Sequence, residues 1–109
     1  MKHHHLDDMT RGWFVGDFAP VALRTEHTEV AVQKYKEGDY EARHEHRIAT
    51  ELTLIVSGRA RMMDAEWGPG DIITIEPGEN TDFTALTDVV AVVVKSPSVI
   101  GDKYVLADS

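Results

Sequence analysis

The stretch that decides the fold reads GDYEARHEHRIATE and runs from Gly38 to Glu51. His44 and His46 are separated by one residue, so an extended strand places both imidazoles on the same face. Glu51 follows after a predicted turn at residues 48–50, and a returning strand can bring its carboxylate to the same point. Two imidazoles and one carboxylate that converge can bind a divalent transition metal.

The rest of the chain has the pattern of a β protein. Short segments rich in Val, Ile, Thr, Tyr and Phe alternate with Gly, Pro, Asn and Asp, and helix signals are almost absent. This pattern is typical of an all-β sandwich or barrel. Strands are expected at residues 29–35, 40–46, 51–56, 59–63, 72–76, 81–86, 89–95 and 103–106. The glycines at positions 38, 58, 70 and 78 predict turns that require a positive φ.

The length and composition indicate one domain. A chain of 109 residues forms one core, which we expect to span residues 10–109. Residues 1–9 contain three consecutive histidines without an apolar anchor, so a disordered segment is expected there. The chain has no cysteine, which excludes disulfides, thiolate metal sites and cysteine nucleophiles.

The charge balance limits the possible partners. Acidic residues outnumber basic ones by 19 to 11, for a net charge of −8. Such a chain repels phosphate backbones, so no nucleic-acid partner is expected. The longest apolar run, residues 89–94, is far too short to span a bilayer, so no membrane association is expected. The N-terminus lacks the apolar stretch of a secretory signal, which favours a cytoplasmic location.

Strand alternation also predicts a homodimer. If the two histidines point inward, the inward residues of the following strand are Glu51, Thr53, Ile55 and Ser57. Leu52, Leu54 and Val56 then point outward, and a row of exposed aliphatic side chains favours association. We therefore expect a second copy of the same sheet to cover this face, with the segment at residues 13–15 lying across the partner.

The chain resembles the cupin superfamily. The first cupin motif has a glycine, five residues, His-x-His, three or four residues, a glutamate, six residues and a glycine. Here Gly38, His44, His46, Glu51 and Gly58 match every position. The resemblance implies an all-β fold of the cupin type, a double-stranded β-helix or jelly-roll barrel.

The second cupin motif is only half present. Gly70 and Gly78 occupy their expected places, but Glu76 stands in the proline position. Thr81 replaces the motif's histidine and Ala85 its asparagine.

The resemblance also implies a metal site. Cupins usually hold a metal with three histidines and a glutamate, which here implies His44, His46 and Glu51 as ligands of Fe, Mn, Ni or Zn. A threonine hydroxyl is a poor ligand, so Thr81 leaves the fourth position open. Asp82 could supply the fourth ligand if the strand carries a bulge there, although strict alternation places Asp82 on the outer face. Alternatively, a water molecule could complete the coordination shell. The alternative is a buried polar cluster without metal.

Two functions remain open. One is a metal-dependent isomerase, epimerase, lyase or dioxygenase acting on a small sugar-like or organic-acid metabolite. The other is a non-catalytic binding module, an accessory in polysaccharide metabolism, whose metal site is lost. Beyond the ligands, the residues predicted to line the pocket are Tyr40, Thr53, Ser57 and Glu76, and Tyr40, Glu76 and Asp82 are candidate bases.

Overall fold

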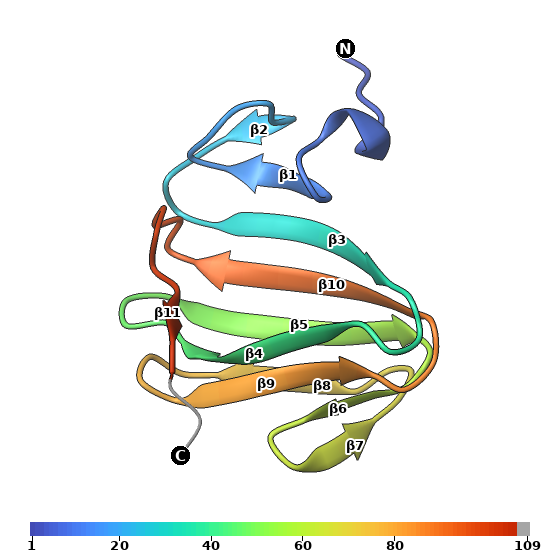
Figure 1. The fold of residues 1–109 in the computed structure, drawn as a ribbon. Coiled ribbons are helices and arrows are strands. Elements are labelled where there is room, and N and C mark those ends of the chain that lie inside the picture. The colour runs from blue at the N-terminus through green and yellow to red at the C-terminus, as the bar shows by residue number, and fades with distance from the viewer. Residues whose placement is uncertain (107–109) are drawn as a thin grey trace.

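Strands dominate the computed structural model, which describes residues 1–106 (Figure 1). They are β1 (Trp13–Gly16), β2 (Leu23–Arg24), β3 (Glu29–Tyr35), β4 (Tyr40–Glu45), β5 (Thr50–Ser57), β6 (Ala60–Met62), β7 (Ala65–Trp67), β8 (Ile72–Ile75), β9 (Asn80–Ala85), β10 (Val89–Ser96) and β11 (Tyr104–Val105). One sheet has the order β2-β1-β3-β10-β5-β8, and the other has the order β11-β4-β9-β6-β7. The predicted all-β architecture is confirmed.

The predicted strands match the observed ones closely, with one exception. The strand expected at residues 59–63 is shorter, and a second strand, β7, pairs with it as a hairpin. Met63 and Asp64 form the turn with φ values of 54° and 62°. Such turns usually carry Asn-Gly or Asp-Gly, and this one carries neither glycine nor asparagine. The hairpin therefore lacks its usual sequence signal.

The barrel interior is filled from both sheets. Ile55 and Phe83 are among the buried residues of one apolar cluster that also includes Ile73, Ile75, Met62 and Val89. On β5 the predicted alternation is confirmed from Glu51 to Ile55. Glu51, Thr53 and Ile55 point inward and are buried, whereas the outward Leu52 is 38% exposed.

The alternation fails at the end of β5. Ile55 pairs with Ala91 and Ser57 pairs with Val90, so the register shifts between these two pairs. The extra residue on β5 leaves both Val56 and Ser57 exposed. Ser57 therefore does not point into the barrel as expected.

The glycine of the β5–β6 turn cannot be replaced without strain. Gly58 has a φ of 85°, and a Cβ there would lie 2.0 Å from the backbone oxygen of Asp88. Both the conformation and the space require glycine, as the sequence predicted.

The N-terminal segment lies on its own sheet. β1 pairs with β3 of the same chain, so residues 13–15 extend this sheet (Figure 1). Before it, Leu6–Asp8 form a single 3-10 turn within the segment expected to be disordered. Residues 107–109 of the predicted domain lie outside the described residues. Within residues 1–106 no helix has the length and hydropathy of a membrane span.

Candidate metal centre

A short turn joins the strands that carry the predicted metal ligands. His44 lies in β4, His46 follows its end and Glu51 lies in β5. The carboxylate of Asp102 accepts hydrogen bonds from the backbone amides of residues 47, 48 and 49, with distances of 2.9, 3.1 and 2.9 Å. Burial works to raise the pKa of Asp102, but the three amide donors outweigh it and the pKa lies below its ordinary value. Asp102 thus fixes the path from His46 to Glu51.

Both histidine rings are held through the same ring atom. Nδ1 of His44 lies 2.9 Å from the backbone oxygen of Ala42, and Nδ1 of His46 contacts that of Asp102. A carbonyl oxygen only accepts, so each Nδ1 carries the proton and donates it. In the neutral ring this arrangement leaves the lone pair on Nε2, which is the arrangement of metal-ligating histidines.

His46 and Glu51 form a buried pair. Nε2 of His46 lies 3.4 Å from Oε1 of Glu51, and among the described residues this nitrogen has no hydrogen-bond partner. The Glu51 carboxylate raises the pKa of His46 against the opposing effect of burial. Burial works to raise the pKa of Glu51, but His46 and Lys95 lower it below its ordinary value.

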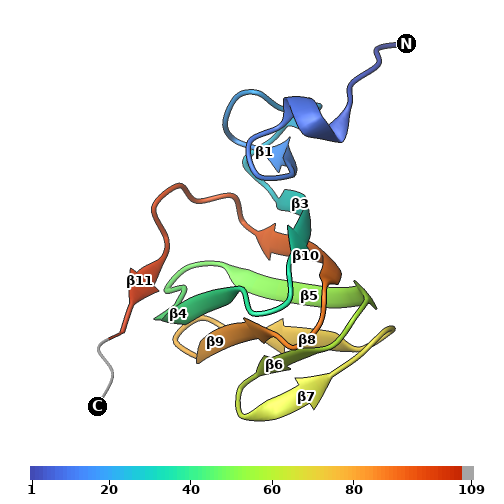
Figure 2. The ribbon, with the colours of Figure 1, turned by 45° about the vertical axis from the view of Figure 1, so that its right-hand side comes forward.

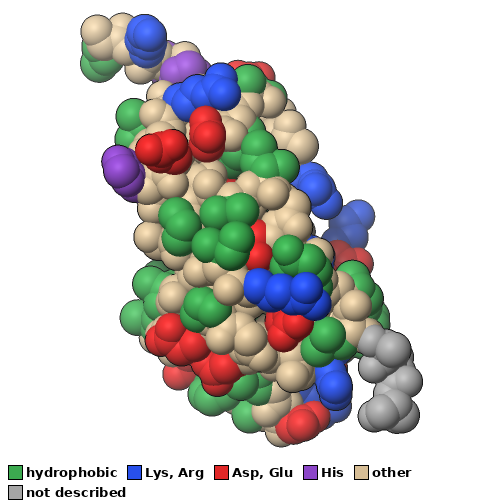
Figure 3. All heavy atoms as spheres, turned by 90° about the vertical axis from the view of Figure 1, so that its left-hand side faces the viewer, with side chains coloured by type: hydrophobic (Ala, Val, Ile, Leu, Met, Phe, Trp, Pro, Cys, Tyr) green, Lys and Arg blue, Asp and Glu red, His purple; other side chains and the backbone are tan. Residues whose placement is uncertain are grey.

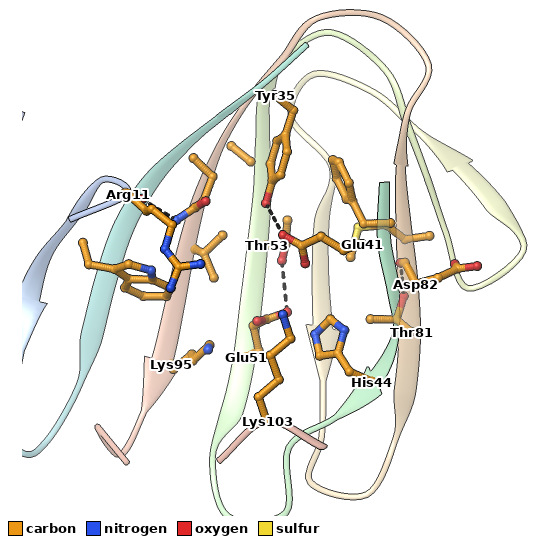
Figure 4. A pocket seen from close by; sticks show the side chains of 16 residues that line it. Arg11, Tyr35, Glu41, His44, Glu51, Thr53, Thr81, Asp82, Lys95 and Lys103 are labelled. Atoms are coloured by element: carbon orange, nitrogen blue, oxygen red, sulfur yellow. Dashed lines mark hydrogen bonds between the residues drawn. The ribbon is translucent and has the colours of Figure 1, made fainter. Parts of the chain in front are cut away.

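Three further predicted residues lie beside this pair. Thr53 is buried, and its hydroxyl donates to Oε2 of Glu51 at 3.5 Å. Thr81 is also buried, but its hydroxyl donates to the backbone oxygen of Asp82 at 2.7 Å. Asp82 borders the same cavity, yet its carboxylate is turned away from His44 (Figure 4).

The predicted ligands are neighbours without forming a closed site. Residues 1–106 contain no group of three or more His, Cys, Asp or Glu side chains that could hold a metal ion as they stand. His44 and Glu51 line one cavity, and His46 lines the adjoining one. Two Nε2 atoms with fixed tautomers and one carboxylate match a divalent transition metal in chemistry. The three side chains would have to draw closer together to bind it.

A cavity of about 160 Å³ lies inside the barrel beside these residues (Figure 4). At one end the Tyr35 hydroxyl donates to Oε1 of Glu41 at 3.2 Å. Burial, followed by the charge of Glu41, raises the pKa of Tyr35 above its ordinary range. The cavity is lined by both polar and apolar side chains, and among the latter are Met62 and Phe83. A small polar metabolite matches such a lining.

Three predicted pocket residues lie away from this cavity. Tyr40 begins β4 and is 58% exposed, because the barrel end leaves its ring outside. Ser57 is carried outward by the register shift in β5. Glu76 is exposed after the end of β8 and accepts a hydrogen bond from Thr50 at 3.3 Å. Asp102 was not predicted from the sequence, because the turn that it holds is distant along the chain and no local pattern marks the contact.

Solved structures with the same architecture support the fold. A protein with a double-stranded β-helix domain from Klebsiella pneumoniae superposes with a TM-score of 0.68 and 22% identity, over 78% of this chain and 74% of that one. A sugar phosphate isomerase of the cupin superfamily from Silicibacter pomeroyi gives 0.62 and 18%, over 66% and 52%. Bacillus subtilis oxalate decarboxylase, described with Mn(II) centers, gives 0.66 and 19%, over 77% and 25%.

These likenesses establish the fold, a double-stranded β-helix barrel of the cupin type. The chain spans about half of the isomerase and a quarter of the decarboxylase. No family model and no curated protein matches the sequence. The cupin resemblance of the first motif is therefore confirmed at the level of the fold, and proteins of this fold carry out different reactions.

Proposed function

We propose that this cupin binds a divalent transition metal through His44, His46 and Glu51 and acts on a small sugar-like or organic-acid metabolite. The observation that carries the proposal is the buried Nε2 of His46, which has no hydrogen-bond partner within residues 1–106 and faces Glu51. A buried polar atom without a partner is costly, and a bound cation removes that cost.

The chain's own residues would orient the metabolite and move its protons. Asp102 and Ala42 hold the two imidazoles, and Thr53 orients the Glu51 carboxylate. The metal would supply Lewis-acid polarisation of a substrate oxygen. Of the candidate bases, Tyr40 and Glu76 lie outside the cavity and Asp82 borders it. An isomerase, epimerase, lyase or dioxygenase activity would therefore depend on Asp82 or on a base from the substrate itself.

A second candidate function is a binding module without catalysis, such as an accessory in polysaccharide metabolism. Thr81 favours it, because its hydroxyl is bound to the chain's own backbone and it stands where cupins place the third histidine. The metal would then be vestigial or absent, and the cavity would only hold its ligand.

We also propose a cytoplasmic homodimer. Leu52 and Val56 are 38% and 50% exposed on the outer face of the larger sheet, and Ile72 beside them is 65% exposed. Adjacent strands extend this apolar surface, with Val94 opposite Leu52 and Val92 opposite Leu54. An apolar sheet face of this kind favours pairing with a second copy.

Metal content tests the main proposal. The protein should be purified without nickel resin, with His3, His4 and His5 replaced by alanine, and analysed by plasma mass spectrometry. We expect close to one transition metal per chain, and loss of that metal in the His44→Ala, His46→Ala variant. His27→Ala is the control, since that histidine is exposed elsewhere on the surface. Absence of metal after incubation with Fe, Mn, Ni or Zn would leave only the binding module.

A further inference from the structure

Two hollows meet beside the candidate metal centre. The second has a volume of about 300 Å³ and lies between the N-terminal segment and residues 99–103. Trp13, Lys95 and Lys103 line both hollows, so the two spaces adjoin along these side chains. Figure 2 shows how the chain between β10 and β11 arches away from the barrel at this end. A ligand longer than the inner cavity could therefore extend into the outer hollow.

Cationic side chains gather at this junction from separate parts of the chain. Arg11 precedes β1, Lys95 lies near the end of β10 and Lys103 precedes β11, and all three line the inner cavity (Figure 4). Within residues 1–106 none of the three forms an ion pair with an acidic side chain within 4.0 Å, whereas Arg24 pairs with Asp17 and Arg47 with Glu45. In a chain with a net charge of −8, these three cations lie around one cavity, where they face Glu41, Glu51 and Asp82.

Five acidic side chains line the two hollows, and all but Asp82 have hydrogen-bond or ion-pair partners within residues 1–106. Glu41 accepts a hydrogen bond from Tyr35 in the inner cavity. Glu29, which is buried and lines the outer hollow, accepts one from Ser98 at 3.1 Å. Glu51 is paired with His46. The Lys95 ammonium lies 5.0 Å from the centre of the Trp13 ring, and its charge lowers the pKa of Glu51, but it forms no ion pair within 4.0 Å among residues 1–106. Lys95, Lys103 and Arg11 can therefore still contact an anion brought by a ligand.

The outer hollow offers apolar walls. Phe18, Ala49, Val99 and Ile100 line it together with Trp13, and Ile100 is 74% exposed. Figure 3 views the molecule from this end and shows hydrophobic side chains exposed among charged ones. Walls of this kind favour the hydrocarbon part of a ligand.

We propose that the two hollows form one site for an amphipathic carboxylate. The acid group lies at the junction, where Lys95 and Lys103 bind it with support from Arg11, and the apolar body lies in the outer hollow against Trp13. This inference rests on the proposed function, because it names the ligand class of the same barrel site. Within the proposed class of sugar-like or organic-acid metabolites, it selects an organic acid with an apolar body.

Fluorescence of Trp13 reports binding directly. Trp67→Phe removes the other tryptophan, which lies in β7 and donates to Met62 at 3.0 Å. Octanoate, octanol and acetate are then titrated into this variant. We expect octanoate to change the Trp13 emission. Its affinity should be at least about tenfold higher than that of octanol or acetate. Equal binding of octanol overturns the role of the lysines, and equal binding of acetate overturns the role of the outer hollow.

Charge variants test the junction. In the same background, Lys95→Gln and Lys103→Gln should each weaken octanoate binding about tenfold, as expected for loss of a charge-assisted contact. Lys95→Arg should restore most of the affinity, which separates charge from packing. Lys36→Gln is the control, because Lys36 is exposed in the β3–β4 turn. Unchanged octanoate binding in the Lys95→Gln, Lys103→Gln double variant overturns the inference.

The same titrations separate this inference from the proposed function. They are carried out on chelator-treated protein and on protein supplied with Mn(II) or Zn(II). Octanoate preference in a protein that takes up no metal refutes the metal centre and supports the carboxylate site. Metal uptake without octanoate preference supports the metal centre and refutes the carboxylate site.

Discussion

His44 and Thr81 lie directly opposite each other on β4 and β9, and both side chains are buried. Side chains of directly opposed residues have Cβ atoms about 4.5–5.5 Å apart. A histidine at position 81 would therefore bring a third imidazole next to His44. We expect Thr81→His to raise the affinity for Zn(II) or Mn(II) by about tenfold or more, measured by competition with a chromogenic chelator.

The control for this change is Thr84→His. Thr84 lies on the same strand but on its outer face, between the buried residues Phe83 and Ala85. An outer histidine should leave the metal affinity unchanged. If both variants bind metal equally, the gain comes from added histidine alone and the barrel site is not involved.

Asp102 should contribute strongly to stability through the turn that it holds. Asp102→Ala removes the acceptor for three backbone amides in a site where the side chain is 5% exposed. Loss of a buried, charged hydrogen-bonding group costs about 2–3 kcal/mol in the free energy of unfolding. Urea denaturation followed by circular dichroism measures this difference. A loss below about 0.5 kcal/mol, the range of ordinary surface substitutions, would contradict the role given to Asp102.

The fold was predictable because its signals are local. The spacing of Gly38, His44, His46, Glu51 and Gly58 and the alternation of apolar residues depend only on neighbouring positions. The hairpin formed by β6 and β7 was missed because its turn residues, Met63 and Asp64, adopt positive φ values without the usual glycine or asparagine.

The site was predictable only in part, for a different reason. Strand alternation placed Thr53 inside correctly, but it depends on an unbroken register, and the shift opposite Val90 and Ala91 turned Ser57 outward. The contact of Asp102 with the turn after β4 and the presence of Arg11 and Lys95 around one cavity depend on the three-dimensional path of the chain. No spacing in the sequence reports them.

Tyr35 should resist ionisation in alkaline solution. Burial and the neighbouring Glu41 raise its pKa, so the folded value lies above the ordinary value of 10.0. The stabilising contribution of the protonated phenol is therefore complete below about pH 10 and is lost as the pH rises beyond it. Absorbance at the phenolate band should show that Tyr35 ionises only on unfolding.

Tyr35→Phe provides the comparison. The variant loses the hydrogen bond to Glu41, which is worth about 1 kcal/mol. The absorbance change on alkaline unfolding should fall by the amount for one phenol, while the change before unfolding stays the same. A fall in the early change would show that Tyr35 titrates as an exposed group.

The outer face of the larger sheet should control association. Ile72 lies opposite Leu54 across β8 and β5, so a charge at position 72 would lie within the apolar surface of the proposed interface. Ile72→Glu should convert a dimer into a monomer, because a desolvated carboxylate without a partner opposes pairing of two apolar sheets. Sedimentation velocity at several protein concentrations measures the change. Thr84→Glu, on the outer face of the other sheet, should leave the dimer intact. If the unmodified protein sediments as a monomer at every concentration, the proposed dimer is wrong.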